Sequence, residues 1–308
     1  MNRDSPSDMT NGKKALITGI KGFTGQYMAA ELSAAGYEVF GFGSSPAQNK
    51  PNYLQVDLTD FAAVKKAVEA ASPDVVVHLA AIAFVGHADP KAFYDVNLYG
   101  TRNLLQALSE AVKRPDAVLI ASSANVYGNN TPGSLSELIE ARPANDYAVS
   151  KLAMEYMASL FFEKLPIIIA RPFNYTGVGQ ADNFLIPKIV KHFRERQQVI
   201  ELGNIDVWRD FSDVRDVVKD YRALLQAPAY GKTVNVASGQ MHSLREVVKL
   251  CEELTNHQIR IEINPQFVRP NEIKELCGDI SLLKNLISNN SSRITLRETL
   301  QWMLQAKE

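Results

Sequence analysis

The chain has 308 residues, of which 46% are hydrophobic and 22% are charged. These values are typical of one or two globular units with a large buried core, and they exclude a disordered or fibrous chain. The net charge is −1, and the basic residues form no run of the kind that follows a phosphate backbone. The composition therefore predicts no nucleic-acid partner and no attraction to an anionic membrane.

Three further features bear on location. The two cysteines, Cys251 and Cys277, have neither metal-ligand spacing nor the density of a disulfide scaffold, which favours a reducing cytoplasm and no metal site. Residues 1–12 are polar and lack the apolar stretch of a secretory signal, so we expect a flexible tail. Because no apolar run approaches the length of a membrane span, we expect a cytoplasmic protein.

Short apolar runs alternate with helix-like stretches over the first 172 residues. Such runs, bounded by turn residues, predict strands buried on both faces of a parallel sheet. The expected strands are Ala15–Thr18, Glu38–Phe42, Val75–Ala81, Ala117–Ser122 and Ile167–Ala170, and the expected helices are Phe23–Ala35, Phe61–Ala71, Ala92–Val112 and Asp146–Glu163. Right-handed crossovers then wind an α/β fold, a Rossmann-type doubly wound sheet that binds ligands at the carboxyl ends of its strands.

The pattern changes after Arg171-Pro172. We expect a loop over Asn174–Asp182, a helix over Pro187–Arg196, a strand over Val199–Leu202, a helix and strand returning to the main sheet over Asp213–Leu225 and Val234–Val236, and a terminal helix over Thr295–Gln305. The predicted dinucleotide-binding domain therefore covers residues 13–172 plus about 211–237. A smaller substrate-binding lobe covers 173–210 and 238–308.

A glycine-rich turn follows the first expected strand and opens the first expected helix. Gly19 permits a tight turn, Gly22 lets the backbone approach a pyrophosphate, and Gly25 lets the helix pack close to the sheet. We expect N–H groups at the helix start, including those of Phe23 and Thr24, to hold the phosphates. A three-glycine turn alone also occurs as an ordinary strand-to-helix connection, but its place after the first strand favours a cofactor site.

The end of the second strand predicts the type of cofactor. An enzyme that uses NAD usually has a carboxylate there, whereas this chain has Ser44 and Ser45, which leave room for a 2′-phosphate. We therefore expect NADP(H), with NAD(H) remaining open because no arginine stands at this point and the nearest cation in sequence is Lys50. Asp57, followed by Leu58, is placed to accept a hydrogen bond from the adenine amine; alternatively it is a carboxylate at a helix start.

Tyr147 and Lys151 form a candidate catalytic pair. Their i, i+4 spacing puts both on one face of a helix. A lysine ammonium beside a phenol favours the phenolate and lowers the phenol's pKa from about 10, so the tyrosine can protonate a carbonyl oxygen as hydride reaches the carbon. Ser122 and Ser123, at the end of a strand, supply a hydroxyl that polarises the same oxygen.

Motifs along almost the whole chain resemble those of the extended short-chain dehydrogenases/reductases (SDRs) that act on nucleotide sugars. They are the glycine turn from Gly19 to Gly25, His78-Leu79-Ala80-Ala81, Asn97 with Gly100-Thr101, Ser122 to Gly128, Tyr147 to Lys151, and Arg171-Pro172-Phe173-Asn174. The resemblance implies that Ser123 is the catalytic serine and that Leu79, Ala80, Ala81 and Asn97 belong to the cofactor site. His78 is better explained as a packed strand-end residue, and Asn97 also as a structural hydrogen-bonder.

The residues after Ser123 reduce the number of reactions that the site could catalyse. Related 4,6-dehydratases place an acidic group there, and the epimerase-reductase that makes GDP-fucose places a cysteine, whereas this chain has Ala124 and Asn125, which do not titrate. Hydride transfer alone remains, as in a 4-ketoreductase or a 4-epimerase.

C-terminal segments resemble those of GDP-4-keto-6-deoxy-D-mannose reductases, which form GDP-D-rhamnose. The resemblance implies that Asn174, Lys188, Arg209 and Arg269 bind the sugar diphosphate, that Glu272 binds the nucleotide ribose or base, and that Phe84, Ser123 and Asn125 contact the sugar.

The leading hypothesis is therefore an NADPH-dependent reductase of a nucleotide-bound 4-keto-6-deoxyhexose, with GDP-4-keto-6-deoxy-D-mannose as the expected substrate and GDP-D-rhamnose as the expected product. The alternatives are an NAD-dependent 4-epimerase, a reductase of a CDP- or dTDP-linked keto sugar, and a dinucleotide sensor without catalysis. By resemblance, the chain is expected to form a homodimer through its Ala92–Val112 and Asp146–Glu163 helices.

Overall fold

The computed structural model describes residues 12–46, 52–83, 89–129, 133–268, 274–287 and 292–306. Contacts group the chain into two compact units, each made of several segments. The first unit contains Met1–Val126, Pro143–Arg171 and Val218–Val234, and the second contains Tyr127–Arg142, Pro172–Val217 and Asn235–Glu308. Residues 127–142 and 211–217, which the sequence had grouped with the dinucleotide-binding domain, therefore lie in the second unit.

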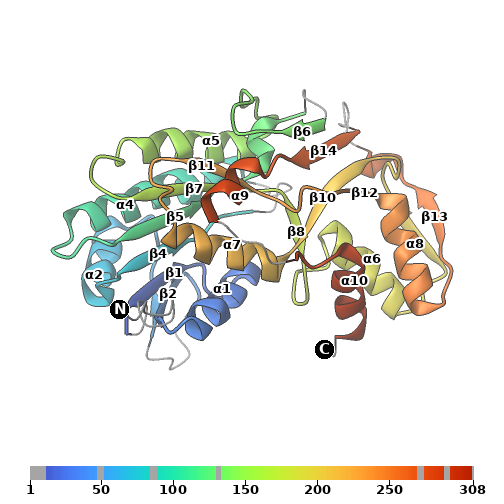
Figure 1. Ribbon diagram of the computed structural model, residues 1–308, viewed down its shortest axis with the longest axis horizontal. Helices are drawn as coiled ribbons and strands as arrows, with labels where there is room; N and C mark the ends of the chain where they lie inside the picture. Colours follow the sequence, from blue (N-terminus) through green and yellow to red (C-terminus); the bar gives the residue numbers. More distant parts are fainter. Residues whose placement is uncertain are drawn as a thin grey trace, which may run out of the picture. The chain divides into compact units, whose positions relative to one another are not determined.

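A seven-stranded sheet of order β11-β7-β5-β4-β1-β2-β3 forms the centre of the first unit (Figure 1). From β3 through β2, β1, β4 and β5 to β7, each strand pairs in parallel with the next. The strands are β1 Lys14–Thr18, β2 Glu38–Gly43, β3 Tyr53–Gln55, β4 Val75–His78, β5 Ala117–Ala121, β7 Ile167–Pro172 and β11 Thr233–Val236. The strand order reverses beside β1, which confirms the predicted doubly wound α/β fold.

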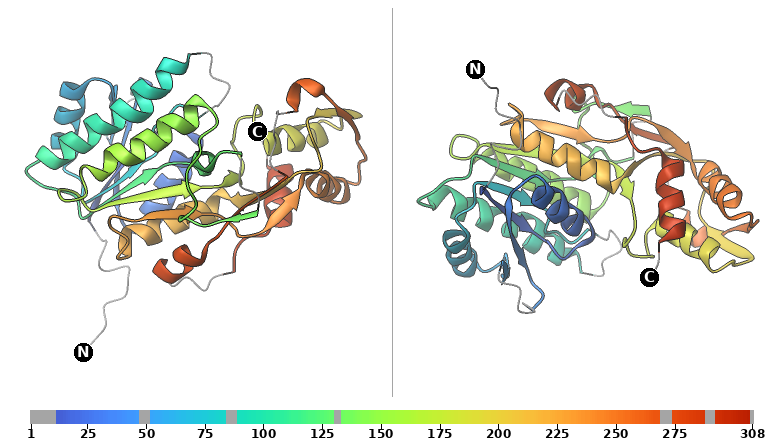
Figure 2. Two further views of the ribbon diagram at one scale, coloured as in Figure 1. Left: turned by 90° about the horizontal axis from the view of Figure 1, so that it is seen from above. Right: turned by 60° about the horizontal axis from the view of Figure 1, so that its bottom comes forward.

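Helices cover both faces of this sheet (Figure 2). One face carries α2 Phe61–Ala71, α4 Thr101–Glu110 and α5 Asp146–Ser159, and the other carries α1 Phe23–Ala34 and α7 Val214–Gln226. Helix α2 illustrates why the helices pack on the sheet. One of its faces is apolar and buried, and it consists of Val64, Ala67, Val68 and Ala71 at helical spacing. They join the apolar side chains of α4, α5 and the central strands in one core.

The expected single helix over Ala92–Val112 is divided into three parts. It begins as α3 Pro90–Phe93, continues as the π-helical segment η1 Tyr94–Gly100, and ends as α4. The wider turns of η1 bring the Asn97 side chain to the backbone of Ile82, where Asn97 Oδ1 accepts from Ile82 N at 2.9 Å. Asn97 Nδ2 also donates to Ser150 Oγ at 3.0 Å. These tertiary contacts accompany the π-helical segment, which helical periodicity in the sequence did not predict.

Other element ends differ from the expected ones by a few residues. The strand expected over Val75–Ala81 ends at His78, and soon after it Ala80 N donates to the side-chain oxygen Thr18 Oγ1 at 3.1 Å instead of to the backbone of β1. The strand expected to reach Ser122 ends at Ala121, and the helix expected to reach Glu163 ends at Ser159.

The second unit contains a mixed sheet of order β12-β10-β14-β6, with β8 pairing with the far end of β10. Its strands are β6 Gly133–Leu135, β8 Asn174–Thr176, β10 Trp208–Asp213, β12 Met241–Ser243 and β14 Glu275–Gly278, and a separate pair joins β9 Val199–Leu202 to β13 Arg260–Ile263. The expected loop over Asn174–Asp182 thus begins with a strand, because Asn174, Tyr175 and Thr176 pair with Phe211 to Asp213.

Helices α6 Leu185–Arg194, α8 Leu244–Thr255 and α10 Leu296–Gln305 enclose a second apolar core with β9. The remaining helices are α9 Ser281–Ile287 and the short 3-10 turns η2 Ala124–Tyr127 and η3 Pro265–Phe267. Among the described residues, no helix is both long and apolar enough to cross a membrane.

Candidate functional site

The glycine turn lies between β1 and α1, where the backbone is packed too closely for a side chain. Gly19 has a φ of +71°, and a Cβ there would lie 2.9 Å from Ala80 N at the end of β4. A Cβ on Gly25 would lie 2.3 Å from Gly19 O. Only glycine meets both demands, so the turn holds the start of α1 against the carboxyl ends of β1 and β4.

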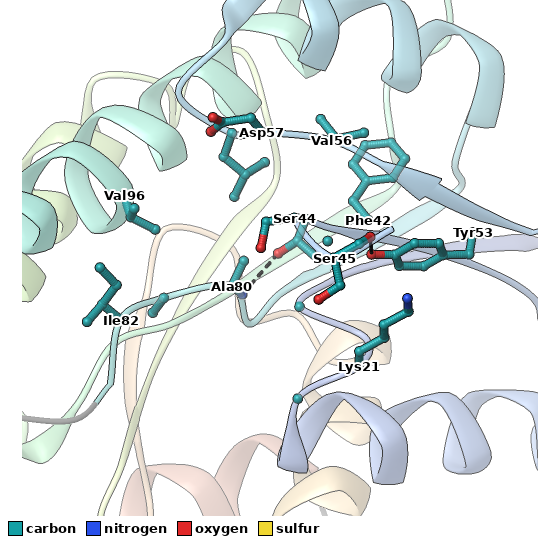
Figure 3. Close-up of a pocket in the computed structure, with 16 residues that line it drawn as sticks. Lys21, Phe42, Ser44, Ser45, Tyr53, Val56, Asp57, Ala80, Ile82 and Val96 are labelled. Carbon is teal, nitrogen blue, oxygen red and sulfur yellow. Dashed lines mark hydrogen bonds between the residues drawn. The ribbon is translucent and has the colours of Figure 1, made fainter. Parts of the chain in front are cut away.

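A pocket of about 550 Å³ opens beside this turn (Figure 3). It is lined by the carboxyl ends of β1, β2 and β4 and by the segments that follow them. Its lining consists of Thr18, Gly19, Lys21, Gly22, Phe42, Gly43, Ser44, Ser45, Tyr53, Val56, Asp57, Leu58, Ala80, Ala81, Ile82 and Val96. The expected cofactor residues from the glycine turn, from the end of β2 and from the end of β4 thus share one pocket, while Phe23, Thr24 and Gly25 follow it in α1.

One end of the pocket is cationic. Lys21 Nζ lies 4.1 Å from the centre of the Tyr53 ring and donates to Pro46 O at 2.6 Å. Tyr53 Oη donates to Ser45 O at 2.6 Å, so β3 fixes the segment after β2. Figure 3 shows the Lys21 side chain reaching toward Tyr53 beside Ser45. The sequence interpretation missed Lys21 because it sought a cation after the second strand, whereas this one comes from the glycine turn itself.

Asp57 lies at the upper edge of the pocket in Figure 3. Its Oδ1 accepts hydrogen bonds from Thr59 N at 2.9 Å and from Thr59 Oγ1 at 2.8 Å. The N-cap of α2 is Asp60, which accepts from Ala63 N, so Asp57 is not the carboxylate that caps this helix. Its carboxylate is thereby fixed beside Leu58, facing the pocket.

The three candidate catalytic residues belong to the first unit. Ser123 follows β5 and its Oγ accepts from Asn125 N at 3.1 Å. Tyr147 and Lys151 lie in the first two turns of α5, and both are buried. The Tyr147 ring packs edge-on against Phe93 with a centroid distance of 6.0 Å. Lys151 Nζ donates to Ala121 O at 2.8 Å, which brings the ammonium to the end of the strand that leads to Ser123.

Burial lowers the pKa of Lys151 from 10.5 to about 8, because a charged ammonium loses its water, and the Glu155 carboxylate opposes this shift. The ammonium form therefore still prevails at neutral pH. The action of this cation on the Tyr147 phenol, one helical turn earlier, stays a prediction.

His78 and Asn97 are committed to structural contacts. The His78 ring lies between two hydroxyls, with Nδ1 2.6 Å from Thr18 Oγ1 and Nε2 2.8 Å from Thr101 Oγ1. Burial, and secondarily the Lys151 charge, lower the pKa of His78 to about 3, so the ring is neutral at physiological pH. Asn97 is fully buried, and its amide binds Ile82 and Ser150. The described contacts of both side chains are therefore with neighbouring groups of the protein.

The expected substrate residues are distributed over both units. Asn125 is exposed on η2 in the first unit. In the second unit, Asn174 is exposed on β8, Lys188 Nζ donates to Glu201 O at 2.8 Å and lies 4.5 Å from the centre of the Phe267 ring, and Arg209 Nη1 donates to Trp208 O at 2.9 Å. Phe84, Arg269 and Glu272, together with Lys50, lie outside the described residues.

Both cysteines are buried free thiols. Burial is the main reason why the pKa of each is raised to about 12, and Asp210 adds to the shift at Cys277. Thiols with such values are poor nucleophiles and poor metal ligands at neutral pH. Within the described ranges, no group of three or more histidine, cysteine or carboxylate side chains is arranged to hold a metal ion.

Comparison with known families identifies the class of protein. The family model described as GDP-mannose 4,6 dehydratase matches residues 16–303. The chain therefore belongs to this family, and it is an oxidoreductase of the extended SDR type. The sequence-based resemblance is thereby confirmed at the level of the family.

Two curated relatives are similar over nearly their whole length. GDP-6-deoxy-D-talose 4-dehydrogenase from Aggregatibacter actinomycetemcomitans is 35% identical, with 94% of this chain and 96% of the relative covered. GDP-6-deoxy-D-mannose reductase from Pseudomonas aeruginosa is 33% identical, with 95% and 96% covered.

Solved structures give the same picture. A candidate epimerase from Burkholderia cenocepacia J2315 has a TM-score of 0.90 at 49% identity, covering 96% of this chain and 97% of its own. The enzyme RMD from Pseudomonas aeruginosa, solved in complex with NADPH, has a TM-score of 0.84 at 31% identity with the same coverage.

The neutral, buried state of His78 predicts a pH-dependent stability. Because its pKa falls from 6.5 in the unfolded chain to about 3 in the fold, its stabilising contribution is complete above pH 6.5 and is lost as the pH falls toward 3. Between pH 7.5 and 5.0 this one group should remove about 2 kcal/mol from the free energy of unfolding. Urea unfolding of the natural protein and of His78→Gln at both pH values measures it. Equal losses in the two proteins would contradict the assignment.

Proposed function

We propose that this protein uses NADPH to reduce the C4 keto group of GDP-4-keto-6-deoxy-D-mannose, giving GDP-6-deoxy-D-mannose, also called GDP-D-rhamnose. The observation that carries the proposal is the set of groups at the carboxyl edge of the sheet. A dinucleotide-sized pocket adjoins the glycine turn, a lysine ammonium is buried at the end of β5, and Ser123 is followed by Ala124 and Asn125, which cannot take or give a proton.

The chemistry of the two curated relatives supports the same ketone. 6-Deoxy-D-talose and 6-deoxy-D-mannose differ only in configuration at C4, so oxidation of either sugar at C4 gives one and the same 4-keto sugar. One curated relative is named as a 4-dehydrogenase of GDP-6-deoxy-D-talose, and the other is named as a GDP-6-deoxy-D-mannose reductase. We infer that this chain acts on that shared ketone, and that the face from which hydride arrives decides the product.

In this proposal each catalytic residue has one task. The cofactor supplies hydride to the carbonyl carbon. Tyr147 delivers the proton to the carbonyl oxygen, the Ser123 hydroxyl donates a hydrogen bond to that oxygen, and the Lys151 ammonium favours the phenolate that Tyr147 becomes. No further acid or base is needed, which separates this reaction from the dehydration for which the family is named.

NADP(H) rather than NAD(H) is supported by the charge at one end of the pocket. No carboxylate follows β2, while Lys21 and the hydroxyls of Ser44 and Ser45 line the place where a 2′-phosphate would lie. The complex of RMD with NADPH agrees with this choice. The glycine turn with Gly22, Phe23 and Thr24 would hold the pyrophosphate, Asp57 and Leu58 the adenine, and the segment Leu79 to Ala81 the nicotinamide half.

We further infer that the second unit supplies the substrate contacts. Its cationic and amide groups suit a sugar diphosphate, and we assign Asn174, Lys188 and Arg209 to this task together with Arg269. Glu272 is assigned to the nucleotide, and Phe84 and Asn125 to the sugar.

A homodimer is supported by apolar side chains left in solvent on two neighbouring helices of the first unit. Tyr156 is 70% exposed on α5, where Val149 lies on the same face, and Leu160 is 75% exposed directly after this helix. Tyr99 is 58% exposed on η1, which packs against α5. Apolar side chains gathered in this way usually meet a partner. We propose a second copy of the chain, related by a two-fold axis that pairs α5 with its equivalent.

The reaction is tested with NADPH and enzymatically prepared GDP-4-keto-6-deoxy-D-mannose. We expect loss of absorbance at 340 nm and a product identified by NMR as GDP-D-rhamnose; the talose epimer would assign the chain to the other relative's chemistry. Tyr147→Phe should lower kcat by about 100- to 10,000-fold while NADPH binding stays near normal, since only the acid is removed.

The outcomes separate the alternatives. If the protein does not reduce this ketone but reduces CDP- or dTDP-linked keto sugars, those sugars are its substrates. Tightly bound NAD in the purified protein, with interconversion of C4 epimers, would indicate the 4-epimerase. Cofactor binding without turnover of any sugar would favour the dinucleotide sensor without catalysis.

Cofactor choice is tested by Lys21→Ala. Loss of one charge-assisted contact to a phosphate should weaken NADPH binding by about 10- to 100-fold and leave NADH binding unchanged. Fluorescence titration of both cofactors measures this, with the exposed Lys66→Ala on α2 as a control of equal charge. If both cofactors weaken equally, Lys21 does not read the 2′-phosphate.

The dimer is tested by placing charges on the exposed face of α5. Tyr156→Glu combined with Leu160→Glu should convert the natural dimer to a folded monomer, because two like charges per subunit would be buried at the axis. Light scattering after gel filtration gives the mass, and circular dichroism checks the fold. A monomeric natural protein would refute the proposal.

A further inference from the structure

A buried carboxylate lies on the same helix as the candidate catalytic residues. Tyr147, Lys151 and Glu155 follow one another at four-residue intervals on α5, and all three are buried. Glu155 is 6% exposed and takes no part in the hydride and proton transfers proposed above. A carboxylate is costly to bury, so its partners indicate what it does there.

Glu155 joins the two strands that lie beneath the candidate catalytic set. Its Oε1 accepts from Ser122 Oγ at 2.5 Å, at the end of β5. Arg171, on β7, forms a two-pronged pair with it, with Nε 3.0 Å from Oε1 and Nη2 2.6 Å from Oε2. Ser122 N donates in turn to Ala170 O at 2.7 Å. The helix and both strand ends are thus tied together at the residue that precedes Ser123.

The same carboxylate acts on the candidate catalytic ammonium. Lys151 Nζ donates to Ala121 O, next to Ser122, and has lost its water. Burial lowers the pKa of Lys151 to about 8, and the Glu155 charge limits that fall. The Lys151 charge also reaches His78 on β4, which is neutral, and the Tyr147 phenol lies one helical turn before Lys151 on α5. The positive charge of Arg171 is paired with the Glu155 carboxylate.

We propose that Glu155 is a positioning residue for the reaction, which fixes Ser123 through the Ser122 hydroxyl and keeps the Lys151 side chain in its charged form. The assignment rests on the proposed function, because it takes Ser123, Tyr147 and Lys151 as the catalytic residues. A purely structural role explains the arrangement less well, since a buried ion pair can usually be replaced by apolar groups of similar size without loss of stability.

The decisive variant is Glu155→Gln combined with Arg171→Met. It removes both charges together, so no unpaired ion is left in the core, and the glutamine amide can still meet the Ser122 hydroxyl. The companion variant is Arg171→Met alone, which leaves the carboxylate and removes the cation that competes for it. Glu163→Gln removes an exposed carboxylate just after α5 and is the matched control.

The charge of Lys151 can be measured by NMR without any substrate. The protein is made with lysine carrying ¹³C at Cε, and the Lys151 signal is assigned from its absence in Lys151→Arg. The chemical shift of this signal is then followed with pH, and the midpoint of the titration is determined. We expect Arg171→Met to raise the midpoint, and the double variant to have a midpoint about one to two pH units below that of Arg171→Met, because these two variants differ only in the Glu155 charge; Glu163→Gln should leave the midpoint unchanged. Equal midpoints in the folded double variant and in Arg171→Met would overturn the proposal.

Turnover gives the second readout. Because the reduction needs the charged lysine, activity is lost as the pH rises through the Lys151 pKa, and a lower pKa moves this loss to lower pH. At pH 8 the double variant should turn over about tenfold more slowly than Arg171→Met, with NADPH binding near normal in both. Identical pH profiles in these two variants would overturn the proposal. If the natural protein turns over no keto sugar at all, the proposed function fails, while the lysine titration still decides the role of Glu155.

Discussion

The first unit is organised around a lysine ammonium held without water at the end of a parallel strand. A cation in that position is unstable unless oxygen atoms and a negative charge face it. The Ala121 carbonyl supplies the first and Glu155 the second, and Glu155 in turn needs Arg171. Helix α5 and strands β5 and β7 are therefore fixed relative to one another by charge as well as by the apolar core beneath them.

The dinucleotide pocket depends on a different constraint, the close approach of backbone segments. Gly19 passes the end of β4 so tightly that a side chain would meet Ala80, and the hydroxyl of Thr18 accepts from the N–H groups of Leu79 and Ala80. The carboxyl ends of β1 and β4 are thus joined before any ligand arrives. Such preorganisation reduces the rearrangement that binding at the start of α1 would require.

Family membership and chemistry differ in an instructive way. The family is named for a dehydratase, yet dehydration needs a group that exchanges protons at C5 and C6, and the two residues after Ser123 have none. In the proposed reaction, the fold would fix where hydride is transferred, while a few side chains at the end of β5 would decide whether the reaction goes further. The two curated relatives are named for GDP-linked sugars that are C4 epimers of each other.

The sequence alone determined the α/β class, the order of most elements, the glycine turn and the Tyr147–Lys151 pair, because local periodicity, turn chemistry and helical spacing are written in consecutive residues. Its limits are equally physical. The break of the Ala92–Val112 helix depends on Asn97 meeting Ile82, and strand β8 depends on pairing with β10, so neither has a local signal. Lys21 meets Tyr53 and Glu155 meets Ser122 and Arg171 only in the fold. Tertiary structure decided these contacts because charge and hydrogen bonding act between neighbours in space, whatever their separation along the chain.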